Sequence, residues 1–208
     1  MFNCLLTGVG GQGTVLLSRL IGAAAIAKGY NVRGTETIGM AQRGGSVVSH
    51  VRMNNGEIYS PLIPPEGADV LLAFEPAEAV RALPFLKDSG EIITLNRAVR
   101  PVSSALKGDY DASALIDFLR EKVERLTVVD GEDLIRRCGN AKTVNVALLG
   151  AAVARELLPF TMDEAERTLR ERLPEKYLEM NLHALHAGAD TISADTISAD
   201  ITSEDLPC

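Results

Sequence analysis

The sequence predicts a three-layer α/β fold, built on a Rossmann-like, mostly parallel sheet with an antiparallel hairpin excursion. Short apolar runs of strand length alternate with longer runs in which apolar residues recur at helical spacing. A glycine-rich loop joins the first strand candidate to the first helix candidate, as it does in many parallel sheets. The pair Asn55-Gly56 is typical of a tight turn between antiparallel strands, and it supports the excursion.

The N-terminal part alternates strand and helix and then departs from that pattern. Residues 2–7 form an apolar strand candidate, and residues 14–28 form the first helix candidate. A strand that starts at Asn31 completes a β-loop-α-β unit, which we expect to be parallel and right-handed. Residues 47–53 alternate apolar and polar side chains like a half-buried strand, and we expect residues 57–60 to return antiparallel to it.

The rest of the chain supplies the remaining strands and helices. Its strand candidates are residues 70–74, 91–95 and 126–129. Its helix candidates are residues 76–86, 113–124, 130–137 and 141–158, a helix that starts with a capping box of Thr161 and Glu164, and residues 175–187. The helix at 141–158 is apolar almost throughout, so we expect it to be buried in this fold or against a partner.

One domain and a tail account for the chain. Its 208 residues, 46% of them hydrophobic and 24% charged, are enough for one substantial core, which we assign to residues 1–187. Residues 188–208 contain three five-residue repeats with acidic and no basic side chains. Such a short acidic segment offers too little apolar area to fold, so we expect a disordered tail.

Composition argues against several classes of function. The net charge of −7 disfavours a nucleic-acid-binding surface, and no apolar run reaches the roughly 18 to 20 residues that span a membrane. The chain starts directly with a strand candidate and shows no signal-peptide pattern, so we expect a cytoplasmic protein. Cys4, Cys138 and Cys208 are isolated, and the three histidines lack partners at metal-ligand spacing. We therefore expect no metal site.

The glycine-rich loop is the first candidate site. Gly8, Gly10 and Gly13 satisfy the G-x-G-x-x-G pattern, with Gly11 and Gln12 between them. Such a loop directs free amides and the positive end of a helix toward an anion, as in phosphate and dinucleotide sites. It also suits a tight strand-to-helix turn or a subunit interface, and the pattern leaves these alternatives open.

Specific nucleotide sites fit this loop less well. A dinucleotide site requires an acid about 20 residues further on, at the end of the second strand. Glu36 is near that place, but Gly34 and Thr35 intervene. Thr14-Val15 stand where a P-loop has its Lys and Ser/Thr, and no Tyr is followed by a Lys four residues later, as in short-chain dehydrogenases.

The second candidate site is the polar segment that follows the second strand. It combines an acid, an amide and a guanidinium group with three glycines. An Arg beside two glycines can bind a carboxylate or phosphate through paired hydrogen bonds, with room for a ligand to approach the backbone. A solvated loop is the alternative. The candidate ligand or interface residues are Glu36, Met40, Gln42, Arg43, Gly44, Gly45 and Ser46.

Taken together, these segments resemble a known family. Residues 8–13, 36–47, 60–63 and 73–76 are similar to the gamma domain of 2-oxoacid:ferredoxin oxidoreductases, and the resemblance extends over residues 1–187. Pro174-Glu175-Lys176, with Asn181 further on, resembles the indolepyruvate branch of the family. In that branch the domain is a separate small subunit.

The resemblance implies a subunit of a heteromeric enzyme. In this family a large partner subunit holds thiamine diphosphate and magnesium, and electrons pass through its iron–sulfur clusters to ferredoxin. An arylpyruvate is oxidatively decarboxylated to an acyl-CoA, with CoA as co-substrate. This chain has no cysteine cluster, and its Asp130-Gly131 lacks the first glycine of a thiamine-diphosphate motif.

We therefore expect this chain to bind no cofactor alone, to carry no catalytic residue and to be inactive in isolation. Two alternatives remain. The glycine loop keeps open an independent NAD(P)-binding oxidoreductase, and both glycine-rich segments keep open a module that serves only assembly.

Overall fold

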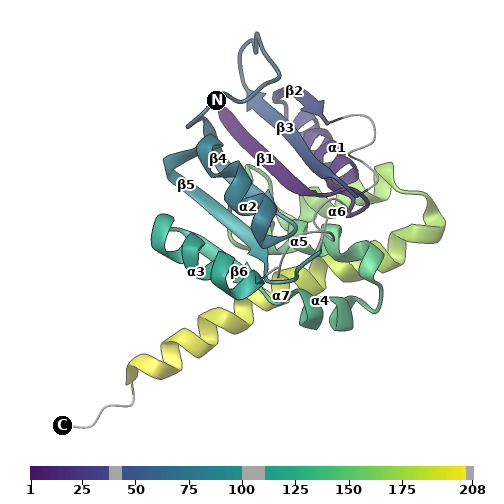
Figure 1. Ribbon diagram of the computed structural model, residues 1–208. Coiled ribbons are helices and arrows are strands. Elements are labelled where there is room, and N and C mark those ends of the chain that lie inside the picture. Colours follow the sequence, from purple (N-terminus) through teal and green to yellow (C-terminus); the bar gives the residue numbers. More distant parts are fainter. Residues whose placement is uncertain (38–43, 100–110, 205–208) are drawn as a thin grey trace.

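In the computed structural model, which describes residues 1–37, 44–99 and 111–204 and side chains as far as Ile192, six strands form one sheet (Figure 1). The strands are β1 (Phe2–Val9), β2 (Asn31–Glu36), β3 (Ser46–Asn54), β4 (Ala68–Ala73), β5 (Leu86–Leu95) and β6 (Leu126–Val129). The α-helices are α1 (Thr14–Ala27), α2 (Pro76–Ala82), α3 (Ala112–Lys122), α4 (Gly131–Cys138), α5 (Val144–Ala154), α6 (Met162–Arg172) and α7 (Glu175–Glu204).

The sheet is mixed, which confirms the expected fold class. Its strand order is β2-β3-β1-β4-β5-β6. β1, β4, β5 and β6 are parallel neighbours, whereas β3 runs antiparallel to both β1 and β2. β2 therefore has the direction of β1 but lies two strands away. The expected β-α-β unit is split, with β3 inserted between its two strands.

The antiparallel excursion exists, but its strands differ from the expectation. Residues 57–60 form no strand. Both edges of β3 are already occupied, one by β1 and the other by β2, so a returning strand has no edge to pair with. The segment is held instead by side chains of β3: the Arg52 guanidinium group donates to the carbonyl oxygens of Ser60 and Leu62.

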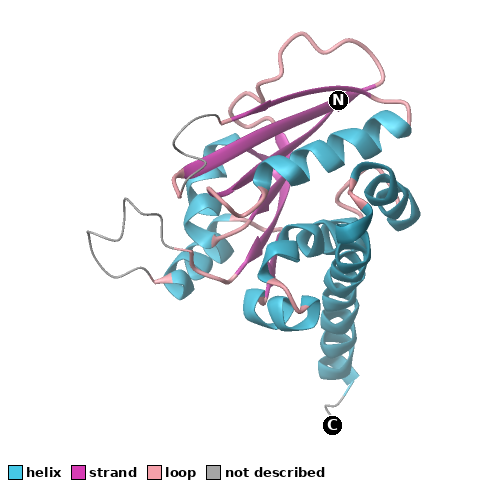
Figure 2. Ribbon diagram, turned by 90° about the vertical axis from the view of Figure 1, so that its right-hand side faces the viewer, coloured by secondary structure: helices cyan, strands magenta, loops and turns pink. Residues whose placement is uncertain are grey.

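Alternating side chains along the strands build one core on each face of the sheet. Cys4 and Leu6 of β1 belong to the core beneath α1, α4, α5, α6 and α7, whereas Leu5 belongs to the core beneath α2 and α3. Figure 1 shows α2 and α3 in front of the sheet, and Figure 2 shows the sheet between the two groups of helices. This is the expected three-layer arrangement.

The apolar segment at residues 141–158 is buried within this fold. It forms a 3₁₀ turn at Ala141–Thr143 followed by α5, which packs along α7. The packing is close: a Cβ atom on Gly150 would lie 1.8 Å from the carbonyl oxygen of Leu185, and one on Gly188 would lie 1.8 Å from that of Ala147.

Helix α7 continues past the expected domain boundary at Ala187. Gly188 contacts α5, and Ile192 is only 8% exposed and belongs to the larger core. The boundary therefore falls inside a packed helix, because the contacts that hold residues 188–192 are with a distant part of the chain. Disorder of the remaining acidic repeat stays a prediction. Across the described ranges, no helix is long and apolar enough to cross a membrane.

Candidate functional site

The candidate site lies where the connections between strands diverge. From the carboxyl end of β1 the chain passes through α1, on one face of the sheet, to β2. From the carboxyl end of β4 it passes through α2, on the other face, to β5 on the opposite side. In open α/β sheets, ligands bind in the crevice at such a switch of direction. The glycine loop of residues 10–13 follows β1 at this place.

The side chain of Gln12 links the glycine loop to the end of the sheet by hydrogen bonds. Its Oε1 accepts a hydrogen bond from the backbone N–H of Val9 at 2.6 Å, and its Nε2 donates to the carbonyl oxygen of Phe74 at 3.3 Å. Gly8 leaves room for this side chain, since a Cβ atom there would lie 2.7 Å from Gln12 Oε1. The amide of Gln12 therefore links the loop after β1 to the end of β4.

Gly13 makes the turn into α1. Its φ angle of +85° is in the left-handed region, and a Cβ atom would lie 2.4 Å from Nδ2 of Asn145, a buried residue of α5. In the described part of the chain no side chain caps the N-terminus of α1. The first amides of this helix are thus available to a ligand or a partner.

The second predicted segment meets the first at this junction. The backbone N–H of Gly10 donates to the carbonyl oxygen of Gly45 at 2.8 Å, and Ser46 pairs with Val9. The structure therefore brings residues 8–13 and 44–46 together. Three further predicted residues of the segment, Met40, Gln42 and Arg43, lie outside the described ranges.

A cavity of about 250 Å³ lies at the junction. Thr14, at the start of α1, is one of its lining residues, and its Oγ1 is buried without a hydrogen-bond partner among the described residues. A buried hydroxyl group without a partner is costly, so this position favours a bound polar group. The residues that line the cavity are Gly10, Gly11, Gly13, Thr14, Val15 and Val47.

Two buried acids stabilise the junction, and the sequence analysis did not select them as site residues. Glu75 and Glu78 are fully buried. Glu75 caps α2 through two backbone amides, while the Glu78 carboxylate accepts from Ser46 Oγ at 2.5 Å and pairs with Arg81. Glu78 thereby fixes the start of β3 against α2. The available signal was an acid before Pro76, directly after a buried strand, which indicates a helix N-cap.

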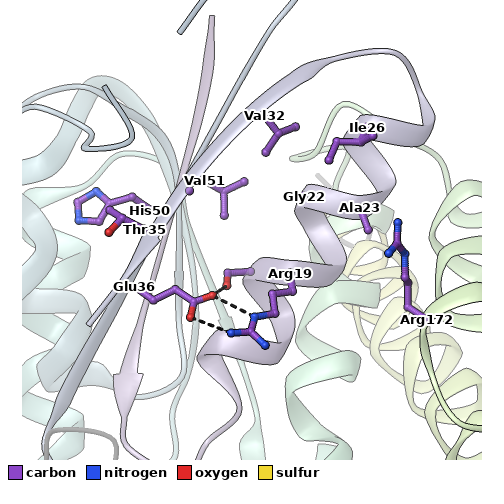
Figure 3. Close-up of a pocket in the computed structure, with 12 residues that line it drawn as sticks. Arg19, Gly22, Ala23, Ile26, Val32, Thr35, Glu36, His50, Val51 and Arg172 are labelled. Carbon is purple, nitrogen blue, oxygen red and sulfur yellow. Dashed lines mark hydrogen bonds and ion pairs between the residues drawn. The ribbon is translucent and has the colours of Figure 1, made fainter. Parts of the chain in front are cut away.

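Glu36 lies apart from the glycine loop. Figure 3 shows its carboxylate beside α1, where it accepts from Ser18 Oγ at 3.1 Å and lies 3.5 Å from Arg19 Nε. In a dinucleotide site the strand that carries the acid lies next to β1. Here β3 separates the two strands, so Glu36 is displaced by a further interstrand spacing of about 4.8 Å. This geometry disfavours the NAD(P)-binding alternative.

The described residues do not fit an iron–sulfur cluster or a metal ion. They contain no group of three His, Cys, Asp or Glu side chains that could hold a metal. Burial raises the pKa of the Cys4 and Cys138 thiols, whereas cluster ligands are thiolates. Asp130 is occupied as the N-cap of α4, where its carboxylate accepts from the amides of Glu132 and Asp133.

Comparisons with known proteins agree with this architecture. Residues 3–191 match the family model described as pyruvate ferredoxin/flavodoxin oxidoreductase. The chain is 38% identical to indolepyruvate oxidoreductase subunit IorB of Archaeoglobus fulgidus, over 89% of this chain and 92% of the relative. The gamma subunit of a keto/oxoacid ferredoxin oxidoreductase from Geobacter sulfurreducens has a similar fold, with a TM-score of 0.68, 22% identity and coverage of 93% of this chain and 99% of that one.

The fold and the junction define an α/β domain with a glycine-lined crevice at the switch point of its sheet. The chain belongs to the pyruvate ferredoxin/flavodoxin oxidoreductase family. The same fold also occurs inside longer chains. A 2-oxoglutarate:ferredoxin oxidoreductase from Magnetococcus marinus, solved with 2-oxoglutarate, coenzyme A and succinyl-CoA, matches with a TM-score of 0.69 and 19% identity, over 93% of this chain and 31% of that one.

Proposed function

We propose that this chain is the small subunit of a 2-oxoacid oxidoreductase of the indolepyruvate type and acts only with a large partner subunit. The identity of 38% to an IorB subunit, across nearly the full length of both chains, carries this proposal. The substrate would be an arylpyruvate, oxidatively decarboxylated to an acyl-CoA. Thiamine diphosphate, magnesium and iron–sulfur clusters would be held by the large subunit, through which ferredoxin would accept the electrons.

Within this function we assign the glycine junction to the binding of an anionic group near the border with the large subunit. The uncapped amides of α1 and the Thr14 hydroxyl group are donors that suit oxygen atoms of a phosphate. The phosphates of CoA supply such oxygens, and CoA is the co-substrate of the proposed reaction. Arg43 is assigned to the same site from the sequence alone. The alternative role of the junction is packing against the large subunit.

Reconstitution of the two-subunit enzyme tests the proposed function. The chain is expressed with and without a candidate large subunit of the family, and turnover of indolepyruvate with CoA is followed through reduction of a viologen dye. We expect activity from the copurified complex and none from the isolated chain, because its described residues provide no metal or cluster site. Turnover by the isolated chain, or failure of the two chains to copurify, contradicts the proposal.

Variants of Arg43 separate the two roles of the junction. If Arg43 contacts CoA, Arg43→Ala should assemble normally but show a raised KM for CoA or a lowered kcat. If it contacts the large subunit, the variant should fail to copurify. Arg43→Lys keeps the charge but loses the planar two-pronged geometry, so it should also be impaired. Normal assembly together with normal kinetics would remove Arg43 from the site.

A further inference from the structure

β2 ends the sheet, and among the described residues no strand pairs with the row of backbone groups on its outer edge. The N–H of Thr37 donates to the carbonyl oxygen of Val48 at 2.9 Å, in register with the β2–β3 pairing. In an antiparallel pair, alternate residues bond across to the neighbour. Counting back from Thr37, the residues Val32, Gly34 and Glu36 therefore direct their N–H and C=O groups outward. This row is a template for an added strand.

The edge lacks two of the devices with which proteins commonly block strand addition, proline and a β-bulge. Such edges carry charged side chains or Pro, contain a bulge or lie under a covering segment, and of these devices β2 has two charged side chains, Arg33 and Glu36. β2 has neither Pro nor Lys, and it pairs with β3 in one continuous register from Asn31 to Glu36. A partner strand thus meets a regular ladder over its whole length.

One groove runs along β2 on the side of α1, and a second lies beside the first residues of β2. One groove of about 520 Å³ lies between α1 and β2, and Figure 3 shows Ala23, Ile26 and Val32 on its wall. The other, of about 480 Å³, is lined by Arg33 and Tyr59 among others. Ile26 is 57% exposed and Tyr59 92%. The side chains of a strand point alternately to opposite faces of the sheet. An added strand would therefore place apolar side chains against both Ile26 and Tyr59.

The charges on these grooves favour an acidic occupant. Arg172 lines the first groove and Arg33 the second, both are exposed, and neither forms an ion pair with another described residue. Arg19 is already beside Glu36. Glu57 is the acid on the second groove. Arg19 and Arg172 outnumber Glu36 in the first groove, so a carboxylate suits the face of an incoming strand that meets it, and Arg33 offers a second unpaired guanidinium group beside Glu57.

We propose that an extended acidic segment of the large partner subunit adds to β2 as a further strand, which makes this edge part of the subunit interface. This inference rests on the function proposed above. A second copy of this chain is a poorer occupant, because a two-fold contact would bring the unpaired Arg33 and Arg172 toward an identical basic surface. In the Magnetococcus relative the matched domain is 31% of a longer chain, so a neighbouring polypeptide is available to it.

Hydrogen exchange of the backbone amides tests strand addition directly. The amides of Val32, Gly34 and Glu36 should exchange rapidly in the isolated chain and at least about tenfold more slowly in the copurified complex. Those of Arg33 and Thr35 should be protected in both, since they bond to β3. Equal exchange of the outer amides in the two states overturns the proposal. Protection that appears in the isolated chain as its concentration rises also overturns it, in favour of self-association.

Matched variants test the same edge by affinity. Val32→Pro removes an outward N–H without removing a bond to β3, and it should weaken complex formation about tenfold relative to Val32→Ala. Arg172→Glu should weaken assembly, unlike Arg167→Glu, an exposed position on the same helix that lines neither groove. Equal affinities within either pair contradict the proposal. If the wild-type chains form no complex, the proposed function is contradicted instead. If the Val32→Pro chain does not fold, hydrogen exchange of the wild-type chain still tests strand addition.

Discussion

Gly13 is fixed as glycine by two constraints that can be measured separately. Its φ angle is +85°, and its missing Cβ atom leaves space for the buried Asn145 side chain. Gly11 is the natural control, since its φ angle is +103° but nothing lies within 4 Å of a Cβ atom there. Gly11→Ala should therefore lower the free energy of unfolding by about 1 to 2 kcal/mol through backbone strain.

Gly13→Ala adds a steric clash to that strain. In denaturant unfolding, we expect Gly13→Ala to lower the free energy of unfolding by about 1 to 3 kcal/mol more than Gly11→Ala does. Asn145→Ala in the Gly13→Ala background should recover part of the difference. Equal losses for the two single variants would show that Asn145 moves aside without cost.

His50 should make the stability depend on pH. Burial, and then the nearby Arg52 charge, lower its pKa below the ordinary 6.5, and its Nδ1 accepts from the N–H of Ile63 at 3.2 Å. The unfolded chain therefore binds this proton more readily than the folded chain does. Stability should be complete above about pH 6.5 and fall as the pH drops toward the lowered pKa, by at most about 1.4 kcal/mol per pH unit.

The measurement compares unfolding free energies of the wild type and His50→Gln between about pH 5 and pH 7. The wild type should lose more stability on acidification than the variant. Parallel curves would show that the folded and unfolded pKa values of His50 are the same.

At the same scale, glycines were the residues of the candidate site that the sequence pattern made easiest to select. Each glycine of the pattern has its own local reason: Gly13 has a positive φ angle, Gly8 leaves room for the Gln12 side chain, and Gly10 donates to the carbonyl oxygen of Gly45. The buried acids at positions 75 and 78 were missed as site residues because charged side chains are assigned to the surface unless a partner is known. Here the partners of Glu78 include a residue 32 positions away.

At the scale of elements, the crossing of α5 and α7 depends on small residues. Gly150→Ala or Gly188→Ala would place a methyl group 1.8 Å from a backbone carbonyl oxygen of the other helix, and backbone cannot move aside as a side chain can. Each should lower the free energy of unfolding by about 3 kcal/mol or more, because the helices must separate.

Gly22 in α1 supplies the matched control for these two substitutions. A Cβ atom there would make an ordinary contact of 3.6 Å with Val32. Gly22→Ala should therefore stabilise the protein by up to about 1 kcal/mol through helix propensity. If Gly150→Ala, Gly188→Ala and Gly22→Ala change the Tm by similar amounts, the α5 and α7 backbones are not in close contact.

The elements themselves were largely predictable, whereas their pairing was not. Sequence patterns located the six strands and the capping box of Thr161 and Glu164, although β5 begins at Leu86, inside the helix predicted for residues 76–86 and five residues before the predicted strand. It did not reveal that β3 enters between β1 and β2, since pairing joins residues far apart in sequence. The predicted tight turn at Asn55-Gly56 does not form, since these residues make a bend in which neither has a positive φ angle, and the edge that the returning strand needed is already occupied.

At the scale of the whole molecule, the glycine-rich junction connects elements that lie on opposite faces of the sheet. α1 and the glycine loop approach from one face, and α2 with Glu75 and Glu78 from the other. Residues 44–46 join them through Gly10 and Glu78. The junction therefore connects α1 on one face of the sheet with α2 on the other.

The end of the folded unit can be located by truncation within α7. A chain that stops after Ile192 keeps the contact of Gly188 with Ala147 and the buried Ile192 side chain. A chain that stops after Ala187 loses both, and burial of one Ile side chain alone is worth about 1.5 to 3 kcal/mol.

We therefore expect the chain that ends at Ile192 to melt within a few degrees of the full-length protein and to copurify normally with the large subunit. The chain that ends at Ala187 should melt at a clearly lower temperature, because about 2 kcal/mol displaces the Tm of a domain this size by roughly 4 to 8 °C. The family match ends at residue 191, close to the last buried side chain, which supports this placement of the boundary. If the two truncated chains are equally destabilised, the acidic repeat beyond Ile192 contributes to the fold; if both match the full-length protein, the contacts of Gly188 and Ile192 are dispensable.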